Sequence, residues 1–470
     1  MNLQFLLRFL VSPSAVIVVS IVMLSAAAGV RLIRRTNQDS LKRGASLLER
    51  GPWFERGPRI LRSLRARSGA ATVSLAGVMI PLADETKHFK LIGTTGTGKS
   101  TAIRELLRAA MARGDRAVIA DPDGGYMARF CDRYRGDVIL NPFERDSVKW
   151  DWFAEINTSY DVEQLASGLI PAGDDPSAAE WRGYARTFLA AVLRRCHLAG
   201  RRDIELVWRL LTVAPAAELR AMLEGTPAQP FLDPDNARMF GSIRSVTGSA
   251  IAAFEYIQAQ RTAPFSVRAW VRTGLTPGAL FIPYKAGQVA AMRSMIATWM
   301  RLAIVEAMSQ PEGDDQRLWF IVDELDALGA IDGLKDALAR LRKFGGRCVL
   351  GLQSIAQVSA TYGHGEAQTI VENCGNTVIL RCSGSENGGT SQFASRLIGD
   401  REVLRRQISR GRERGGAPSR GAHRSHNVTD QYVTEPAVMP AEIEQLPDLC
   451  GYLKCASSRS WRKVAFAHSQ

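Results

Sequence analysis

Residues 93–100 read Gly-Thr-Thr-Gly-Thr-Gly-Lys-Ser, which is a complete G-x-x-x-x-G-K-[ST] phosphate-binding loop. The short, largely apolar stretch 88–92 before it is typical of a buried strand, and residues 101–111 after it are spaced like a helix. The motif requires this strand, loop and helix context. We therefore expect nine residues to bind a nucleotide: Gly93, Thr94, Thr95, Gly96, Thr97, Gly98, Lys99, Ser100 and Thr101.

The residue types in this loop indicate its chemistry. Glycines let successive backbone N–H groups turn towards the phosphates, and the helix that follows adds the positive end of its dipole. Lys99 is expected to reach the outer phosphates, and the Ser100 hydroxyl is expected to ligate Mg²⁺. The sequence thus predicts a site for ATP and Mg²⁺.

A second motif follows more than 200 residues later. Residues 318–322, Leu-Trp-Phe-Ile-Val, form an apolar run of the buried-strand type that ends in two adjacent carboxylates. Such a strand fits a Walker B element, in which Asp323 holds Mg²⁺ through its water shell. Glu324 would orient and deprotonate the attacking water. Together the two motifs predict an ATPase.

The segment after the Walker B strand supplies further candidates. Residues 331–344 are spaced like an amphipathic helix, and 347–352 read as a strand that ends at Gln353. An amide at that strand end is placed to sense the γ-phosphate. Arg342 or Arg347 could serve a neighbouring subunit as an arginine finger. A cation at a helix C-terminus can equally well offset the helix dipole, so both interpretations remain open.

Composition restricts the class of protein. The 470 residues are 46% hydrophobic, which is enough for a large core and excludes disorder of the whole chain. Lysine and arginine number 60 against 47 acidic residues, and this excess indicates a polyanionic partner, with nucleic acid as the first candidate, or a membrane surface. The seven cysteines show neither a C-x-x-C pair nor zinc-type spacing, so we expect a reduced cytosolic domain whose metal is Mg²⁺.

The N-terminal region predicts a membrane anchor. Residues 9–30 contain no charge and are long enough to cross a bilayer as one helix. A cleaved signal peptide is the alternative, with 25–29 as its cleavage region. Three arginines directly after the run place the bulk of the chain in the cytoplasm. Residues 31–67 hold eleven basic and three acidic residues, which suits contact with anionic lipid or a solvated linker.

The remaining pattern predicts an α/β domain with an all-α insertion. Strand-like stretches at 72–81 and 116–121 flank the phosphate loop, helical runs fill the region from 151 to 277, and a strand at 278–283 leads into a helix at 286–308. The expected parts are a membrane anchor at 1–35, a basic linker at 36–69, a nucleotide-binding domain at 70–150 and 278–470, and the inserted domain at 151–277.

Several motifs in a fixed order resemble one family. They are Gly-Thr-Thr-Gly-Thr-Gly-Lys-Ser at 93–100, Leu-Trp-Phe-Ile-Val-Asp-Glu-Leu at 318–325, Gly-Leu-Gln-Ser at 351–354, Tyr-Gly at 362–363, Glu-Ala-Gln-Thr at 366–369, Val-Met-Pro-Ala-Glu-Ile at 438–443 and Leu-Pro-Asp-Leu at 446–449. This set resembles the conjugative type IV coupling proteins of the TraD/TrwB kind, from about residue 70 to the end of the chain.

The resemblance implies a RecA-like P-loop domain with a membrane-distal all-α domain, assembled as a homo-hexamer anchored in the bacterial inner membrane. It implies that the ring pumps DNA, without reading its sequence, from relaxase and relaxosome proteins towards a type IV secretion channel. Carried over by position, Lys99, Glu324, Gln353 and Arg342 serve catalysis, while Ser100 and Asp323 hold Mg²⁺. Arg342 is favoured over Arg347 as the finger.

The chain departs from the family pattern at both ends. Family members typically carry two membrane helices around a periplasmic loop, whereas one convincing span is visible here. The acidic extension that some relatives use to recruit cargo is not seen after the last strand-like stretch, 451–466.

A basic segment at 401–424 holds eight arginines and two glutamates among glycines and serines. The sequence predicts a basic loop, which would either contact phosphates along a central pore or be solvated without a ligand.

The leading function is a membrane-anchored, DNA-translocating ATPase. The main alternative is an ATPase for protein export or secretion-system assembly that acts on polypeptide. A soluble helicase-like motor is a weaker option, because of the apolar run at 9–30.

Overall fold

The computed structural model describes residues 45–50, 53–56, 72–172, 176–274, 277–313, 316–386, 388–412 and 424–467. The transmembrane helix expected over 9–30, and most of the linker at 36–69, lie outside the described residues. Within the ranges just given, no helix is both long and apolar enough to cross a bilayer.

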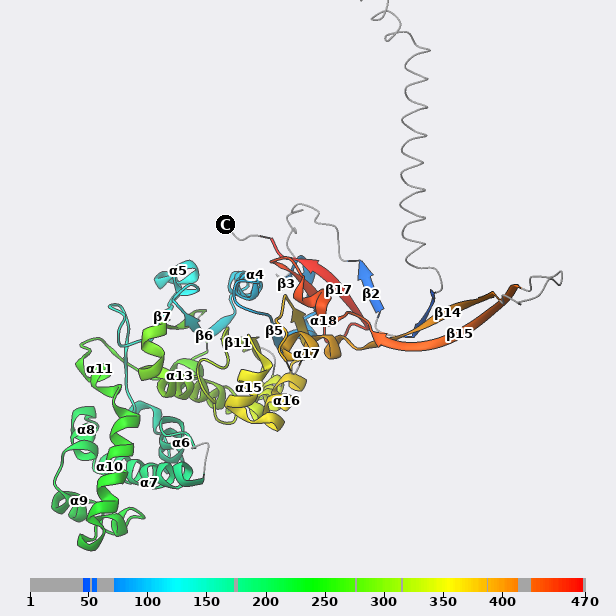
Figure 1. Cartoon of the computed structure of the whole chain (residues 1–470). Coiled ribbons are helices and arrows are strands. Elements are labelled where there is room, and N and C mark those ends of the chain that lie inside the picture. Colours follow the sequence, from blue (N-terminus) through cyan, green and yellow to red (C-terminus); the bar gives the residue numbers. More distant parts are fainter. Residues whose placement is uncertain are drawn as a thin grey trace, which may run out of the picture. The chain divides into compact units, whose positions relative to one another are not determined.

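The described chain separates into two compact units. The larger unit contains a sheet whose strands, in the described residues, follow the order β2-β17-β16-β13-β5-β12-β11-β6-β10-β7 (Figure 1). Their bounds in that order are Trp53–Arg56, Ser460–Ala465, Cys450–Lys454, Asn376–Ile379, Phe89–Ile92, Gly346–Leu352, Leu318–Val322, Arg116–Pro122, Ala279–Tyr284 and Val138–Ile139.

The strands from β13 to β7 are all parallel to one another, whereas β16 is antiparallel to β13 and to β17. Parallel strands have their carboxyl ends at the same edge of a sheet, and ligands of open α/β sheets bind at that edge. The segments that follow β5, β12, β11, β6 and β10 therefore converge. This arrangement confirms the expected α/β domain.

Helices cover both faces of the parallel part of the sheet (Figure 1). Ile103 and Leu106 of α4 (Lys99–Ala112) share one core with Ile119 of β6, Trp319 of β11 and Val349 of β12. The apolar helix α13 (Ala286–Ala307) packs on β6, β10 and β11. Strands buried on both faces read as continuous apolar runs, which is why 318–322 was recognisable in the sequence.

Short strands and helices outside the region between β6 and β10 complete this part of the unit. They are β3 (Ser74–Leu75), β4 (Val78–Met79), α3 (Leu82–Glu85), α5 (Met127–Phe130), α14 (Leu334–Arg340), α15 (Ile355–Tyr362), α16 (His364–Asn373), α17 (Gly389–Ile398) and α18 (Pro440–Glu444). The antiparallel pair of β3 and β4 confirms the strand pair expected at 72–81.

Between β6 and β10 the chain is mainly helical, as expected. The helices are α6 (Ser159–Leu169), α7 (Pro176–Leu198), α8 (Ile204–Thr212), α9 (Ala216–Met222), α10 (Ala237–Ile251), α11 (Phe254–Ala259) and α12 (Val267–Arg272). The chain enters and leaves this region through the parallel pair β8 (Lys149–Trp150) and β9 (Pro264–Phe265). The exact domain boundaries given above stay a prediction.

The smaller unit corrects one expectation. The segment 401–424 is not simply a loop, because β14 (Asp400–Arg412) pairs in antiparallel register with β15 (Arg424–Pro436), and β1 (Ala45–Arg50) pairs with β14. Arginine and glycine suggested a loop, but the partner strand holds valine, threonine and tyrosine, which favour strands. Residues 413–423 lie outside the described ranges.

A second correction concerns the helix expected over 331–344. The α-helix begins only at Leu334, after Gly333 in a left-handed conformation (φ 76°), and ends at Arg340. A 3₁₀ turn at Leu341–Phe344 and the left-handed Gly345 complete the segment. Glycine adopts positive φ at little cost, so Gly333 and Gly345 mark both ends.

Candidate functional site

The phosphate-binding loop joins β5 to α4, and all nine expected nucleotide-binding residues lie in it or in the first turn of α4. A Cβ atom on Gly93 would lie 2.8 Å from Thr97 Oγ1 and 2.9 Å from Leu380 Cβ, so a larger residue does not fit. Gly96 (φ 78°) and Gly98 (φ 117°) have left-handed conformations. These glycines give the loop the tight turn that a phosphate cradle requires.

Lys99 lies at the centre of the loop. Its buried Nζ donates to the carbonyl oxygens of Gly93 (2.7 Å) and Thr94 (3.1 Å). Burial lowers the pKa of Lys99, and the charges of Asp323 and Glu324 oppose that shift. The acceptors of the ammonium are neutral carbonyl oxygens, which a charged phosphate can replace.

The Walker B carboxylate meets the phosphate loop directly. Ser100 Oγ donates to Asp323 Oδ2 at 2.6 Å, across 223 positions of sequence. Asp323 is 4% exposed, and its Oδ1 has no hydrogen-bond partner among the described residues. A buried carboxylate oxygen without a partner is costly unless it accepts a bond, so Oδ1 fits a water molecule of a Mg²⁺ shell. Ser100 and Asp323 therefore suit Mg²⁺.

Glu324 follows Asp323 and is half-buried. Burial raises its pKa, and the charge of Asp323 raises it further, which suits a carboxylate that accepts a proton. The backbone of β12 passes very close to the backbone of Asp323, since a Cβ on Gly351 would lie 1.8 Å from the Asp323 carbonyl oxygen. Only glycine allows the two strand ends to pass so closely.

Gln353 stands at the end of β12, next to the phosphate loop. Its Nε2 donates to Thr95 Oγ1 at 2.7 Å. The structure thus brings Gln353 together with Lys99, Ser100, Asp323 and Glu324 at one edge of the sheet, although their catalytic roles stay predictions.

Comparison with known proteins identifies the family. A family model described as the type IV secretion-system coupling protein DNA-binding domain matches residues 72–467. The chain belongs to this family of coupling proteins. It is 31% identical over 404 residues to the coupling protein TraD of Escherichia coli (strain K12). The aligned region covers 84% of this chain and 54% of TraD. The chain thus spans about half the length of that curated relative.

Solved structures agree with this assignment. The plasmid coupling protein TrwB in complex with ADP and Mg²⁺ is 32% identical, with a TM-score of 0.77, and the match covers 91% of this chain and 96% of TrwB. The TrwB complex with the non-hydrolysable analogue ADPNP is also 32% identical and gives a TM-score of 0.76, over 91% of this chain and 95% of TrwB.

The two candidate arginine fingers of the coupling protein differ in exposure. Arg347 is fully buried, and its Nε lies 2.9 Å from Glu85 Oε2. A buried arginine held in this way cannot reach another subunit, so its place in the fold is structural. Arg342 is exposed in the 3₁₀ turn after α14. This leaves Arg342 as the finger candidate.

A buried histidine fixes the helix that leads to Arg342. Burial lowers the pKa of His88 to about 4, so its ring is neutral. Nδ1 accepts from the Cys348 N–H at 3.0 Å, which leaves Nε2–H to donate to the Leu338 carbonyl oxygen at 2.8 Å. The coupling protein therefore ties α14 to the start of β12.

Sequence reasoning missed several residues of the site. The Tyr126 hydroxyl donates to Asp323 Oδ2 at 2.7 Å, and burial raises the pKa of the neighbouring Asp121 to about 6. The Leu449 N–H donates to the Thr97 carbonyl oxygen at 2.9 Å, and its side chain blocks any Cβ at Gly98. Two features of the sequence could have indicated these residues: the turn after β6 for Asp121 and Tyr126, and the motif at 446–449 for Leu449.

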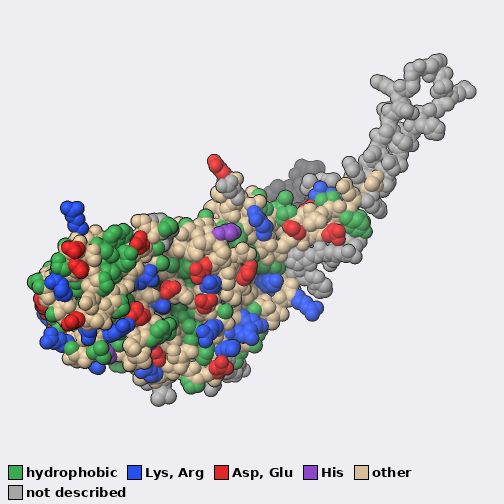
Figure 2. Space-filling view, turned by 90° about the horizontal axis from the view of Figure 1, so that it is seen from below, with side chains coloured by type: hydrophobic (Ala, Val, Ile, Leu, Met, Phe, Trp, Pro, Cys, Tyr) green, Lys and Arg blue, Asp and Glu red, His purple; other side chains and the backbone are tan. Residues whose placement is uncertain are grey.

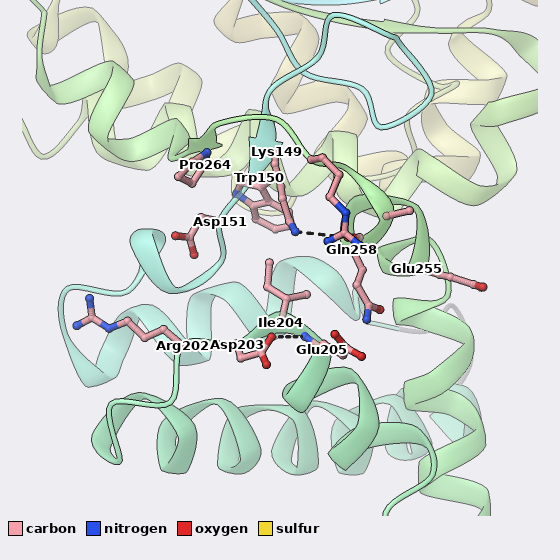
Figure 3. Close-up of a pocket in the computed structure, with 12 residues that line it drawn as sticks. Lys149, Trp150, Asp151, Arg202, Asp203, Ile204, Glu205, Glu255, Gln258 and Pro264 are labelled. Carbon is pink, nitrogen blue, oxygen red and sulfur yellow. Dashed lines mark hydrogen bonds between the residues drawn. The ribbon is translucent and has the colours of Figure 1, made fainter.

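The coupling protein also has a cavity away from this site. It measures about 580 Å³ and lies between β8, α8 and α11 (Figure 3). Charged side chains of both signs line it, including Lys149, Arg202, Glu205 and Glu255. None of the residues predicted to bind the nucleotide or to act in catalysis takes part.

Proposed function

We propose that this coupling protein is an inner-membrane-anchored, homo-hexameric ATPase that pumps DNA during conjugative transfer. In this proposal it has one membrane span with the bulk of the chain in the cytoplasm, and it links relaxase-bound DNA to a type IV secretion channel. The observation that carries the proposal is the bond from Ser100 Oγ to Asp323 Oδ2, because Asp323 Oδ1 has no partner among the described residues and is available to a metal-bound water.

The proposed chemistry is ATP hydrolysis with Mg²⁺, and TrwB has been solved with ADP and Mg²⁺ and with ADPNP. Lys99 would neutralise charge on the outer phosphates, while Ser100 and Asp323 would hold the metal. Mg²⁺ bound there would stabilise the charge that develops on the transferring phosphoryl group. Glu324 would take the proton of the attacking water, and Gln353 would sense the γ-phosphate.

The distribution of charge supports DNA as the substrate. Segment 31–67 has a net charge of +8 and 401–424 a net charge of +6, so the rest of the chain is close to neutral. On the face shown in Figure 2, basic side chains are interspersed with acidic ones rather than gathered in one patch. We therefore assign the main phosphate contacts to the arginine-rich hairpin of β14 and β15, without base recognition.

DNA binding tests this proposal. Binding should be independent of sequence and should weaken steeply from about 50 to 200 mM salt, because each phosphate contact contributes a slope of about −0.9 on duplex DNA. Changing the five arginines found between positions 410 and 424 to glutamine should flatten the slope by up to about 4.5. These are Arg410, Arg412, Arg414, Arg420 and Arg424.

The matched control changes the same five arginines to lysine, which keeps the charge and should keep the slope. DNA affinity that is constant across this salt range, or that is lost when only the base sequence changes, would contradict the proposal. Protein binding without DNA binding would favour the polypeptide-exporting alternative.

A further inference from the structure

The turn after β6 has a fixed shape that the ATPase motifs do not account for. The end of β6 and the turn read Asp121-Pro-Asp-Gly-Gly-Tyr126, and Asp123 (φ 58°) and Gly124 (φ 69°) have left-handed conformations. Asp121 is fully buried, and its carboxylate accepts the N–H groups of Tyr126 (3.0 Å) and Met127 (2.6 Å). A buried charge needs such bonds, so these contacts hold the turn in one conformation.

The turn places the Tyr126 side chain against α4, the helix that follows the phosphate loop. Tyr126 is 2% exposed and belongs to the same core as Ile103 and Leu106 of α4. The guanidinium carbon of Arg104 lies 5.7 Å from the centre of its ring. Packing and the fixed turn therefore leave the hydroxyl little freedom, and a preorganised donor loses little entropy when it binds.

That hydroxyl completes the contacts of one carboxylate oxygen. Asp323 Oδ2 accepts both Tyr126 OH (2.7 Å) and Ser100 Oγ (2.6 Å), while Oδ1 has no partner in the described part of the chain. Two donors on one oxygen fix the rotation of the carboxylate. They also direct the Ser100 hydrogen towards Asp323, so that the serine lone pairs are available to a metal.

We propose that Tyr126 is a positioning residue for Mg²⁺, acting through Asp323. Its hydroxyl holds the carboxylate so that Oδ2 orients Ser100 and Oδ1 can accept from metal-bound water. The inference rests on the proposed Mg²⁺-nucleotide site. In addition to the ends of β5 and β11, which carry the two Walker motifs, the end of β6 then contributes a residue to that site. Residues that orient metal ligands typically contribute 10–100-fold to metal affinity.

Tyr126→Phe tests the inference, because it removes one oxygen and keeps the ring. The measurement is the binding of a fluorescent ADP analogue to the full chain, without Mg²⁺ and then over a Mg²⁺ titration. We expect parent-like binding without the metal, and a Mg²⁺ half-saturation concentration raised about 10–100-fold. The matched control is Tyr184→Phe, since that hydroxyl is exposed and bonds only Glu180 among the described residues.

Each outcome separates the inference from the proposed function. An unchanged Mg²⁺ titration for Tyr126→Phe would overturn the inference, and so would an equal loss of binding with and without the metal, which would indicate a general structural role. A melting temperature close to that of the parent accompanies the expected result. If the parent itself bound no ADP, the proposed function would fail instead.

Discussion

Lys99→Ala is expected to lower ATP hydrolysis by at least about a hundredfold, because it removes a buried positive charge from the place where negative charge develops on the phosphates. The reason lies in the geometry of the loop. Lys99 Nζ is within 3.1 Å of two loop carbonyl oxygens and close enough to Asp323 and Glu324 for their charges to affect its pKa. No other lysine of the described residues occupies this loop.

The measurement is phosphate release by purified full-length protein at saturating ATP. Lys463→Ala is the matched control, since it removes an exposed lysine from β17 and should leave the rate unchanged. The melting temperature of Lys99→Ala should stay near the parent value, because backbone bonds such as that from the Gly93 N–H to the Leu352 carbonyl oxygen remain in place. Hydrolysis by this variant at the parent rate would disprove the assignment of the phosphate loop.

Arg342→Ala is expected to lower hydrolysis by about 10³–10⁵-fold if Arg342 reaches the nucleotide of a neighbouring subunit, as arginine fingers do. Arg342 is exposed, and α14 before it is anchored by the bond from His88 to Leu338. Nucleotide and DNA binding should remain, because the variant leaves its own phosphate loop intact. Arg340→Ala is the matched control, since Arg340 is exposed at the end of the same helix.

Mixing Arg342→Ala with Lys99→Ala then tests whether the finger acts in trans. If subunits mix at random in a closed ring, about one interface in four pairs an intact Lys99 with an intact Arg342. Partial recovery of activity is expected. A fully active Arg342→Ala protein would require another finger, and a dilute monomer active at the full rate would exclude a trans mechanism.

The sequence predicted those parts of the fold that depend on local pattern. The apolar runs before Gly93 and Asp323 became β5 and β11, because strands buried on both faces need continuous apolar residues. The helical run after Lys99 became α4, whose apolar positions face the sheet. Both Walker motifs were therefore recognisable, and the structure brings Ser100 and Asp323 together.

Contacts between distant segments were not predictable from local pattern. In the sequence, Tyr126 is typical of a turn residue. Only the parallel pairing of β6 with β11 in the fold brings its hydroxyl to Asp323. Arg347 stayed a second finger candidate beside the favoured Arg342, because the sequence did not reveal its buried partner Glu85. The hairpin was missed because its arginines resemble a solvated loop, and pairing with β15 overrides that composition.

The proposed function requires that DNA stimulate ATP hydrolysis by this chain. Its most direct test is the rate of phosphate release from full-length protein in a bilayer mimic, with and without DNA of unrelated sequences, using Lys99→Ala as the blank. We expect a low rate without DNA and a clear rise with any DNA, and this rise should be lost in the Lys99→Ala protein. A rate that DNA leaves unchanged at every protein concentration would contradict it.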